Sequence, residues 1–139
     1  MKIMVSACLL GENCKYSGGN NRDERVLAFL AGHEVVPVCP EVMGGLPTPR
    51  PPAEIVQGEV INQLGVSVDR EYRLGAQKTL EIAMREKIDL AILQSRSPSC
   101  GVKQIYDGTF TGTKIPGQGV CVALLMENGF AVLDREEVE

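Results

Sequence analysis

Hydrophobic positions along the chain fall into two patterns, short continuous runs and repeats at helical spacing. The short runs are typical of strands buried in a parallel sheet and occupy residues 2–7, 34–38, 89–94 and 130–133. The helical repeats predict three helices, over residues 24–31, 70–87 and 119–127. This alternation predicts an α/β fold in a single domain, residues 1–139: a three-layer, Rossmann-like sandwich around a mainly parallel sheet of about four strands.

The longest predicted helix, residues 70–87, is expected to have Asp69 as its N-cap. Its apolar residues share one face of a 3.6-residue repeat and are Ala76, Leu80, Ala83, Met84 and Ile88. In the same way Asp23 is expected to cap the first helix, and Gly32 to end it before His33 opens the second strand.

Several segments lack a clear period. Residues 42–52 contain four prolines and two glycines, which predicts a stiff loop that presents Arg50 to a site. Residues 55–68 are expected to form a small hairpin or an excursion at the sheet edge, and residues 106–117 a flap or an irregular loop over the strand ends. The acidic residues 134–139 are expected to fray.

Composition and charge mainly exclude classes of function and location. The net charge of −4, the absence of Trp and an aromatic content of 4% disfavour binding to nucleic acid, because phosphates attract Lys and Arg and bases stack on aromatic rings. No apolar run approaches the ~20 residues that span a bilayer, and the first run is too short for a signal peptide. A cytoplasmic location is therefore expected, where the five cysteines stay reduced and form no disulfide framework.

Three cysteines follow predicted strands: Cys8, Cys39 and Cys100. Parallel strands end at one edge of the sheet, where ligands bind in open α/β folds, so these thiols are expected to converge. Successive cysteines lie 6, 25, 61 and 21 residues apart, which matches no zinc-ribbon or ferredoxin motif. Three thiolates without an obvious fourth partner suit a metal or cluster site with one open position. The alternative is that these cysteines are small buried hydrophobic residues.

Four sequence blocks resemble one bacterial family: residues 6–11, residues 39–41 together with 44–52, residues 96–101 and residues 106–110. It is the domain-of-unknown-function 523 family, whose characterised members are thiouracil desulfidases, and the resemblance covers essentially the whole chain. The resemblance implies a [4Fe–4S] cluster held by Cys8, Cys39 and Cys100, with Glu41 and Ser97 as the catalytic pair. It also implies that the fourth iron takes the sulfur of a small thiolated pyrimidine, which gives uracil and sulfide without net redox chemistry.

The chemistry of the residues is compatible with that reaction. Water must attack the C=S carbon while the sulfur leaves, and iron is a soft Lewis acid that accepts sulfur. Glu41 is expected to move protons, and Ser97 to orient water or the nascent carbonyl oxygen. The alternatives are an N-cap or a salt bridge to Arg50 for Glu41, and a hydroxyl that caps the turn before Pro98 for Ser97.

For the whole protein, the alternative to a desulfidase acting on a small molecule is a non-catalytic metal-binding or thiol redox-sensing module. Cys14 is either a further ligand or sulfur acceptor, or a plain loop cysteine. Cys121 is expected in the core, and His33 at the surface or in a turn rather than on a metal. Pocket lining or loop scaffolding is expected of Lys15, Tyr16 and Arg50. No nucleotide-binding motif is present, and the oligomeric state stays open.

Overall fold

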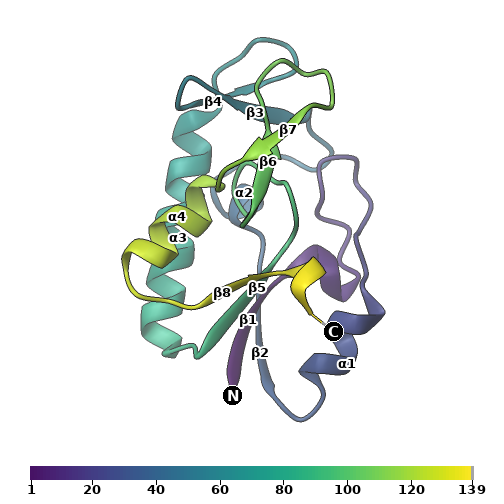
Figure 1. The fold of residues 1–139 in the computed structure, drawn as a ribbon, viewed down its shortest axis with the longest axis vertical. Helices are drawn as coiled ribbons and strands as arrows, with labels where there is room; N and C mark the ends of the chain where they lie inside the picture. The colour runs from purple at the N-terminus through teal and green to yellow at the C-terminus, as the bar shows by residue number, and fades with distance from the viewer. Residues whose placement is uncertain (139) are drawn as a thin grey trace.

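In the computed structural model, which describes residues 1–138, four parallel strands form the central sheet (Figure 1). They lie in the order β2-β1-β5-β8 and are β1 (Lys2–Ser6), β2 (Glu34–Val38), β5 (Leu90–Leu93) and β8 (Val132–Asp134). In register, Met4 of β1 lies opposite Val36 of β2 and Ala91 of β5. The predicted α/β fold with a mainly parallel sheet is confirmed.

Helices cover both faces of the sheet and complete three layers. They are α1 (Glu24–Leu30), α3 (Asp69–Glu86) and α4 (Val120–Glu127). The sheet face that carries Ile3 and Ile92 packs against α1, and the opposite face, with Met4 and Leu93, packs against α3 and α4. Neighbouring apolar residues of one strand therefore enter two separate cores, because successive side chains point to opposite faces. Each such fully buried side chain stabilises the fold by about 1.5–3 kcal/mol.

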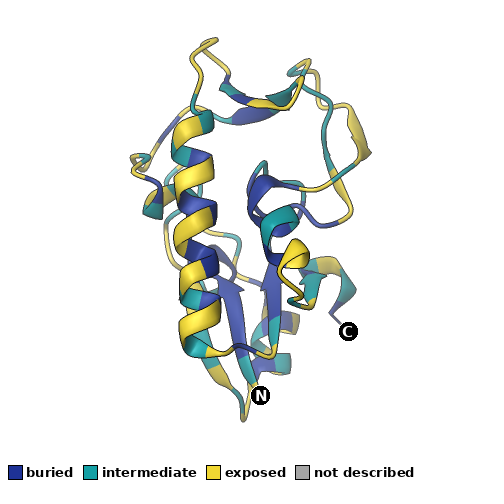
Figure 2. Ribbon diagram, turned by 90° about the vertical axis from the view of Figure 1, so that its left-hand side faces the viewer, coloured by how far each residue is buried: buried dark blue, intermediate teal, exposed yellow. Residues whose placement is uncertain are grey.

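Helix α3 turns one stripe of its surface to the core and the rest to solvent (Figure 2). The buried stripe contains Tyr72, Gly75, Ala76, Thr79, Leu80 and Ala83. The prediction that Met84 belongs to it is wrong: Met84 is 52% exposed because it lies beyond the edge of the stripe. The predicted N-cap is also wrong. Val68 is the N-cap, and the Asp69 carboxylate instead accepts a hydrogen bond from the backbone N–H of Val60 at 3.0 Å.

Two antiparallel hairpins lie beyond the carboxyl ends of the sheet strands, at the top of Figure 1. The first joins β3 (Ala53–Val56) to β4 (Glu59–Asn62), which confirms the small hairpin expected in this region. The second joins β6 (Gln104–Tyr106) to β7 (Lys114–Pro116), so the segment predicted to be a flap or an irregular loop is partly a regular hairpin. The Glu54 carboxylate ties the hairpins together, because it accepts hydrogen bonds from the backbone N–H groups of Gly108 and Phe110.

Two short helical segments follow strands of the sheet, and the second extends into the stiff loop predicted over residues 42–52. They are the 3-10 helix η1 (Ala7–Leu10), after β1, and α2 (Pro40–Met43), after β2. The fixed φ of Pro40 suits the first turn of a helix. Helix α2 packs so closely on α3 that a Cβ added at Gly44 would overlap the α3 backbone, and one at Gly75 would overlap the Pro40 carbonyl. The close contact between α2 and α3 therefore requires a glycine at both positions.

The C-terminal residues pack against the domain, so the prediction that they fray is wrong. The 3-10 helix η2 (Arg135–Glu137) follows β8 and is capped by Asp134, whose carboxylate accepts a hydrogen bond from the Glu136 N–H at 2.8 Å. Val138 is only 3% exposed and enters the core beside α1. Glu139, the last residue of the predicted tail, lies outside the described residues.

Candidate functional site

A cavity of about 470 Å³ lies at the carboxyl edge of the sheet, between the strand ends and the two hairpins. Its wall contains four of the five cysteines: Cys8, Cys14, Cys39 and Cys100. Tyr106 and Phe110 line it from the side of the second hairpin. The carboxyl edge of a parallel sheet is where α/β folds bind ligands. The structure thus brings the three predicted cluster ligands to one cavity, with Cys14 beside them.

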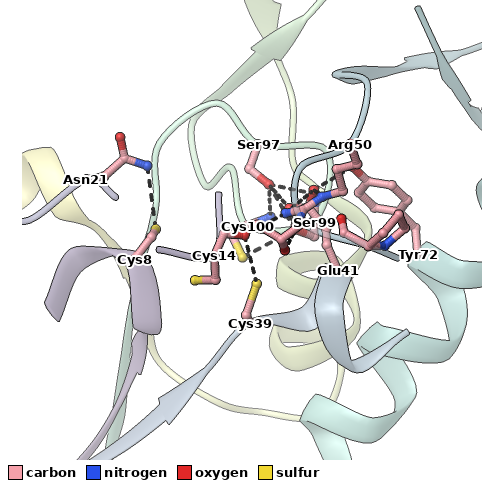
Figure 3. Close-up of polar contacts among 12 residues, drawn as sticks. Cys8, Cys14, Asn21, Cys39, Glu41, Arg50, Tyr72, Ser97, Ser99 and Cys100 are labelled. Atoms are coloured by element: carbon pink, nitrogen blue, oxygen red, sulfur yellow. Dashed lines mark hydrogen bonds and ion pairs between the residues drawn. The ribbon is translucent and has the colours of Figure 1, made fainter. Parts of the chain in front are cut away.

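Sheet order explains why thiols far apart in the sequence meet. Strands β2, β1 and β5 are neighbours, and each leads into one of the three cysteines. Cys39 directly follows β2, Cys8 lies in η1 after β1, and Cys100 lies in the loop after β5. Cys8 and Cys100 are buried, whereas Cys14 and Cys39 are half-buried. Figure 3 shows these side chains coming together from separate segments of the chain.

The Cys14 thiol influences two of the other thiols, those of Cys39 and Cys8. Its contacts with Cys39 and with Cys8 raise the pKa of Cys14 well above its usual range. The same contacts lower the pKa of Cys39 and of Cys8, against the opposing effect of burial, and the Asn21 amide assists by donating to Cys8 Sγ at 3.5 Å. Burial raises the pKa of Cys100. A lowered pKa favours the thiolate, which is the form of cysteine that binds metals.

Glu41 lies in the first turn of α2, and its carboxylate is held from one side by two buried donors (Figure 3). Oε1 accepts a hydrogen bond from the Tyr72 hydroxyl at 2.7 Å and another from Arg50 Nη2 at 3.3 Å. The salt bridge to Arg50, one of the two alternatives for Glu41, is therefore present. The other alternative is wrong, because Cys39 and not Glu41 is the N-cap of α2.

The Ser97 hydroxyl links the loop after β5 to Glu41. Its oxygen accepts hydrogen bonds from the backbone N–H groups of Ser99 and Cys100, each at 3.1 Å, so the expected turn cap is present. The hydroxyl can donate its own proton either to Glu41 Oε2, 3.3 Å away, or to Ser99 Oγ, 2.8 Å away. Ser99 Oγ lies 3.0 Å from the same carboxylate oxygen. Two hydroxyls and one carboxylate thus form a connected path for a proton, with Ser97 and Glu41 at the cavity wall and Ser99 fully buried.

The other candidates divide between the cavity and the rest of the domain. Lys15, Tyr16 and Arg50 all line the cavity. His33 lies just before β2, at the opposite end of the sheet, where its Nδ1 is 2.9 Å from the amino group of Met1. Cys121 is completely buried in the core on the α3 side, as expected.

Sequence reasoning missed three residues that contact the predicted ones: Tyr72, Ser99 and Asn21. Tyr72 extends the buried stripe of α3 by one turn before Ala76, and a buried Tyr hydroxyl needs a hydrogen-bond partner. That requirement was the available signal for Tyr72. Ser99 stands inside the block around Cys100, but nothing in the sequence separates its role from that of Ser97. No local pattern marks Asn21, which reaches Cys8 only through the fold of the first loop.

Within residues 1–138, no group of three or more His, Cys, Asp and Glu side chains is placed to hold a single metal ion. In the same part of the chain, no helix combines the length and the apolar character needed to cross a membrane.

Fold and cavity together define an α/β protein with a thiol-lined site at the carboxyl edge of its sheet, next to a carboxylate fixed by buried donors. The chain belongs to the 2-thiouracil desulfurase family, whose model matches residues 3–137. The resemblance drawn from the four sequence blocks is confirmed.

Two similar proteins cover nearly the whole chain. The uncharacterized protein YbbK of Bacillus subtilis (strain 168) is 39% identical to this chain. The alignment is 146 residues long and covers 98% of this chain and 97% of that protein. A solved structure described as the [4Fe–4S]-dependent thiouracil desulfidase TudS has a TM-score of 0.93 and 40% identity, and the match covers 99% of this chain and 92% of that one. Membership of a desulfurase family favours the enzyme over the non-catalytic module.

Proposed function

We propose that this protein is a [4Fe–4S]-dependent desulfidase that converts a small thiolated pyrimidine into the corresponding pyrimidinone and sulfide. The observation that carries the proposal is the meeting of Cys8, Cys39 and Cys100 in one cavity, next to Glu41 and Ser97. Family membership and the likeness to a structure described as a thiouracil desulfidase support it. The reaction is a hydrolysis: the oxygen of water replaces the sulfur, which leaves as hydrogen sulfide, and nothing is oxidised or reduced.

The donor set fits such a cluster. Iron–sulfur clusters are held by Cys thiolates, and three thiols from three strand ends face a cavity of about 470 Å³. We assign Cys8, Cys39 and Cys100 as the ligands. Held by three thiolates, a [4Fe–4S] cluster supplies one iron without a protein ligand, a soft Lewis acid suited to the sulfur of a C=S group.

Glu41 acts as the base in this proposal. Hydrogen bonds from Tyr72 and Arg50 hold its carboxylate in one orientation. Its second oxygen faces Ser97, whose hydroxyl is aimed by two backbone N–H groups. Water bound at Ser97 gives its proton to Glu41, directly or through the Ser97 hydroxyl, as its oxygen attacks the C=S carbon. The carboxyl group then returns this proton to the departing sulfur, and the second proton of the water follows by the same path as the C=O bond forms, so that the sulfur leaves as hydrogen sulfide.

The remaining cavity wall suits a flat heterocycle. Tyr16, Tyr106 and Phe110 present aromatic surfaces, and Lys15 and Gln63 present polar groups. Ligand pockets of this kind combine apolar and aromatic walls with a few polar groups that orient the ligand. The chemistry of the wall therefore supports a free nucleobase or a similar small ring as the substrate.

The test compares Glu41→Gln and Ser97→Ala with the parent protein after reconstitution without oxygen, using sulfide release from 2-thiouracil as the readout. Glu41→Gln is expected to slow the reaction by about 10²–10⁴-fold, because it removes the proton acceptor. Iron content is expected to stay unchanged in both variants, since neither residue is assigned as a ligand. Arg85→Ala, on the solvent side of α3, serves as the control. Parental activity in Glu41→Gln would exclude the proposed role of Glu41.

A further inference from the structure

The cavity holds one thiol more than the proposed function uses. Cys14 lines the same cavity as the three assigned ligands, and its backbone carbonyl lies within weak hydrogen-bond distance of Cys39 Sγ. Cys14 and Cys39 are also the half-buried cysteines, whereas the three others are buried. A small reagent that enters the cavity therefore meets this pair first.

Several contacts tie the backbone at Cys14 to the segment that follows Cys39. The Cys14 carbonyl accepts a hydrogen bond from Arg50 Nη2 at 3.0 Å and a weak one from Cys39 Sγ at 3.8 Å. Two residues further on, the Tyr16 carbonyl accepts from the Arg50 N–H at 2.8 Å. The Arg50 side chain is itself only 4% exposed and is fixed by Glu41. These contacts hold the backbone at Cys14 next to the Cys39 side chain.

We propose that Cys14 is the disulfide partner of Cys39 in the cluster-free protein, so that the cluster site is closed and protected until it is reduced. The proposal rests on the assignment of Cys39 as a ligand under the proposed function. The disulfide removes one of the three ligands, so the oxidised protein cannot take up a cluster. It also shields Cys39 from the irreversible sulfinic and sulfonic acids, because a disulfide is restored by thiols and these acids are not.

The oxidant is a low-molecular-weight disulfide. The Cys39 thiolate attacks it, one small thiol leaves, and a mixed disulfide remains on Cys39. The Cys14 thiolate then attacks the Cys39 sulfur of that mixed disulfide, forms the Cys14–Cys39 bond and releases the second small thiol. The two cysteines lose two electrons and two protons, and the small disulfide gains them as two thiols. Excess small thiol reverses both steps.

The first test treats cluster-free protein with oxidised glutathione and maps peptides without reduction. The expected product is a Cys14–Cys39 linked peptide, with three of the five thiols still free in the denatured protein. Cys14→Ser is expected to retain glutathione on Cys39 and to form no internal disulfide, because it lacks the second thiol. Cys121→Ser, which changes a core cysteine outside the cavity, is expected to form the same link as the parent. A parent protein without this link, or an internal disulfide that persists in Cys14→Ser, would overturn the proposal.

The second test measures iron uptake with iron and sulfide supplied without oxygen. The oxidised parent is expected to bind iron only after dithiothreitol is added, and never-oxidised Cys14→Ser to bind as much iron as the reduced parent. Uptake by the oxidised parent before reduction, or loss of iron binding in Cys14→Ser, would contradict the proposal. Peptide mapping uses neither cluster nor substrate, so its failure is distinguishable from failure of the desulfidase function.

Discussion

At the scale of single residues, the site is organised by the two oxygens of one carboxylate. Oε1 of Glu41 faces Tyr72 and Arg50, which are buried, and Oε2 faces the hydroxyls of Ser97 and Ser99. Under the proposed function, the first oxygen holds the carboxylate in place and the second accepts the proton. Removing Arg50 would leave Glu41 without its charged partner, a change that typically costs 3–5 kcal/mol in buried pairs. Tyr72 offers a cleaner test.

Tyr72→Phe removes the shortest hydrogen bond to Glu41 and keeps the ring in the core. Sulfide release is expected to fall about 10- to 150-fold, because a hydrogen bond to a charged group contributes about 1.5–3 kcal/mol. Iron content is expected to equal that of the parent. Tyr16→Phe, half-exposed at the cavity mouth, is the control for loss of a hydroxyl. An unchanged kcat in Tyr72→Phe would show that Tyr72 has no part in positioning Glu41.

Part of this site is predictable from the sequence. Cysteines after apolar runs, together with the resemblance, indicate Cys8, Cys39 and Cys100, which the fold brings to one cavity. Tyr72 was missed because its contact with Glu41 spans 31 residues and depends on how α2 lies on α3. Contacts of that kind are set by tertiary packing and leave no local pattern.

At the scale of elements, the contact between α2 and α3 places the Glu41 carboxylate. Four residues of helix in a segment rich in Pro and Gly give no periodic signal, so the sequence predicts only a stiff loop there. The hairpin of β6 and β7 was also not predicted. Strand β7 is exposed throughout, so it has no buried face to produce an alternating pattern of apolar and polar residues. In α3 Asp69, the residue expected as the N-cap, instead accepts a hydrogen bond from the Val60 N–H.

Gly75→Ala tests the placement of α2. Replacing Gly by Ala inside a helix normally stabilises it by about 0.5–1 kcal/mol, but here the added methyl group would overlap the Pro40 carbonyl. The free energy of unfolding is therefore expected to fall by about 1–3 kcal/mol, the usual effect of overpacking. Sulfide release is expected to fall with it, because α2 carries Glu41. Urea denaturation measures the first effect, with Lys78→Ala on the exposed face of α3 as the control; a stabilised Gly75→Ala protein would contradict the predicted overlap.

At the scale of the whole molecule, the C-terminal segment joins parts of the domain on both sides of the site. Arg135 donates to the Asp23 carboxylate at 3.2 Å, and Glu136 forms an ion pair with Arg96 at 2.9 Å, next to the loop that carries Ser97. An acidic terminal segment predicts disorder when only its own residues are considered. Its basic partners lie far away in the chain, so only the assembled fold shows why the segment packs.

Asp23→Ala tests this arrangement and its dependence on pH. Asp23 caps α1 as predicted; burial raises the pKa of its carboxyl group, but hydrogen bonds from the Val26 and Arg25 N–H groups and from Arg135 outweigh burial and lower it. The variant is expected to lose about 1–2 kcal/mol of unfolding free energy.

Because the folded pKa of Asp23 lies below the unfolded value of 3.8, its contribution is complete above that value and disappears as the pH falls through the folded pKa. Urea denaturation of the parent and Asp23→Ala should therefore differ at pH 7 and converge in acid. Glu12→Ala, in an exposed loop, is the control. A difference that does not change with pH would assign the effect to the lost cap geometry instead of the charge.

The most direct test of the cluster assignment is the iron and acid-labile sulfide content of protein prepared without oxygen, in the parent and in Cys100→Ala. The parent is expected to bind four irons and four sulfides per chain, as the [4Fe–4S] formula requires. Cys100→Ala is expected to lose most of both, and Cys121→Ala, in the core, to keep them. Full iron and sulfide in Cys100→Ala, or a parent that binds zinc and no sulfide, would contradict the assignment.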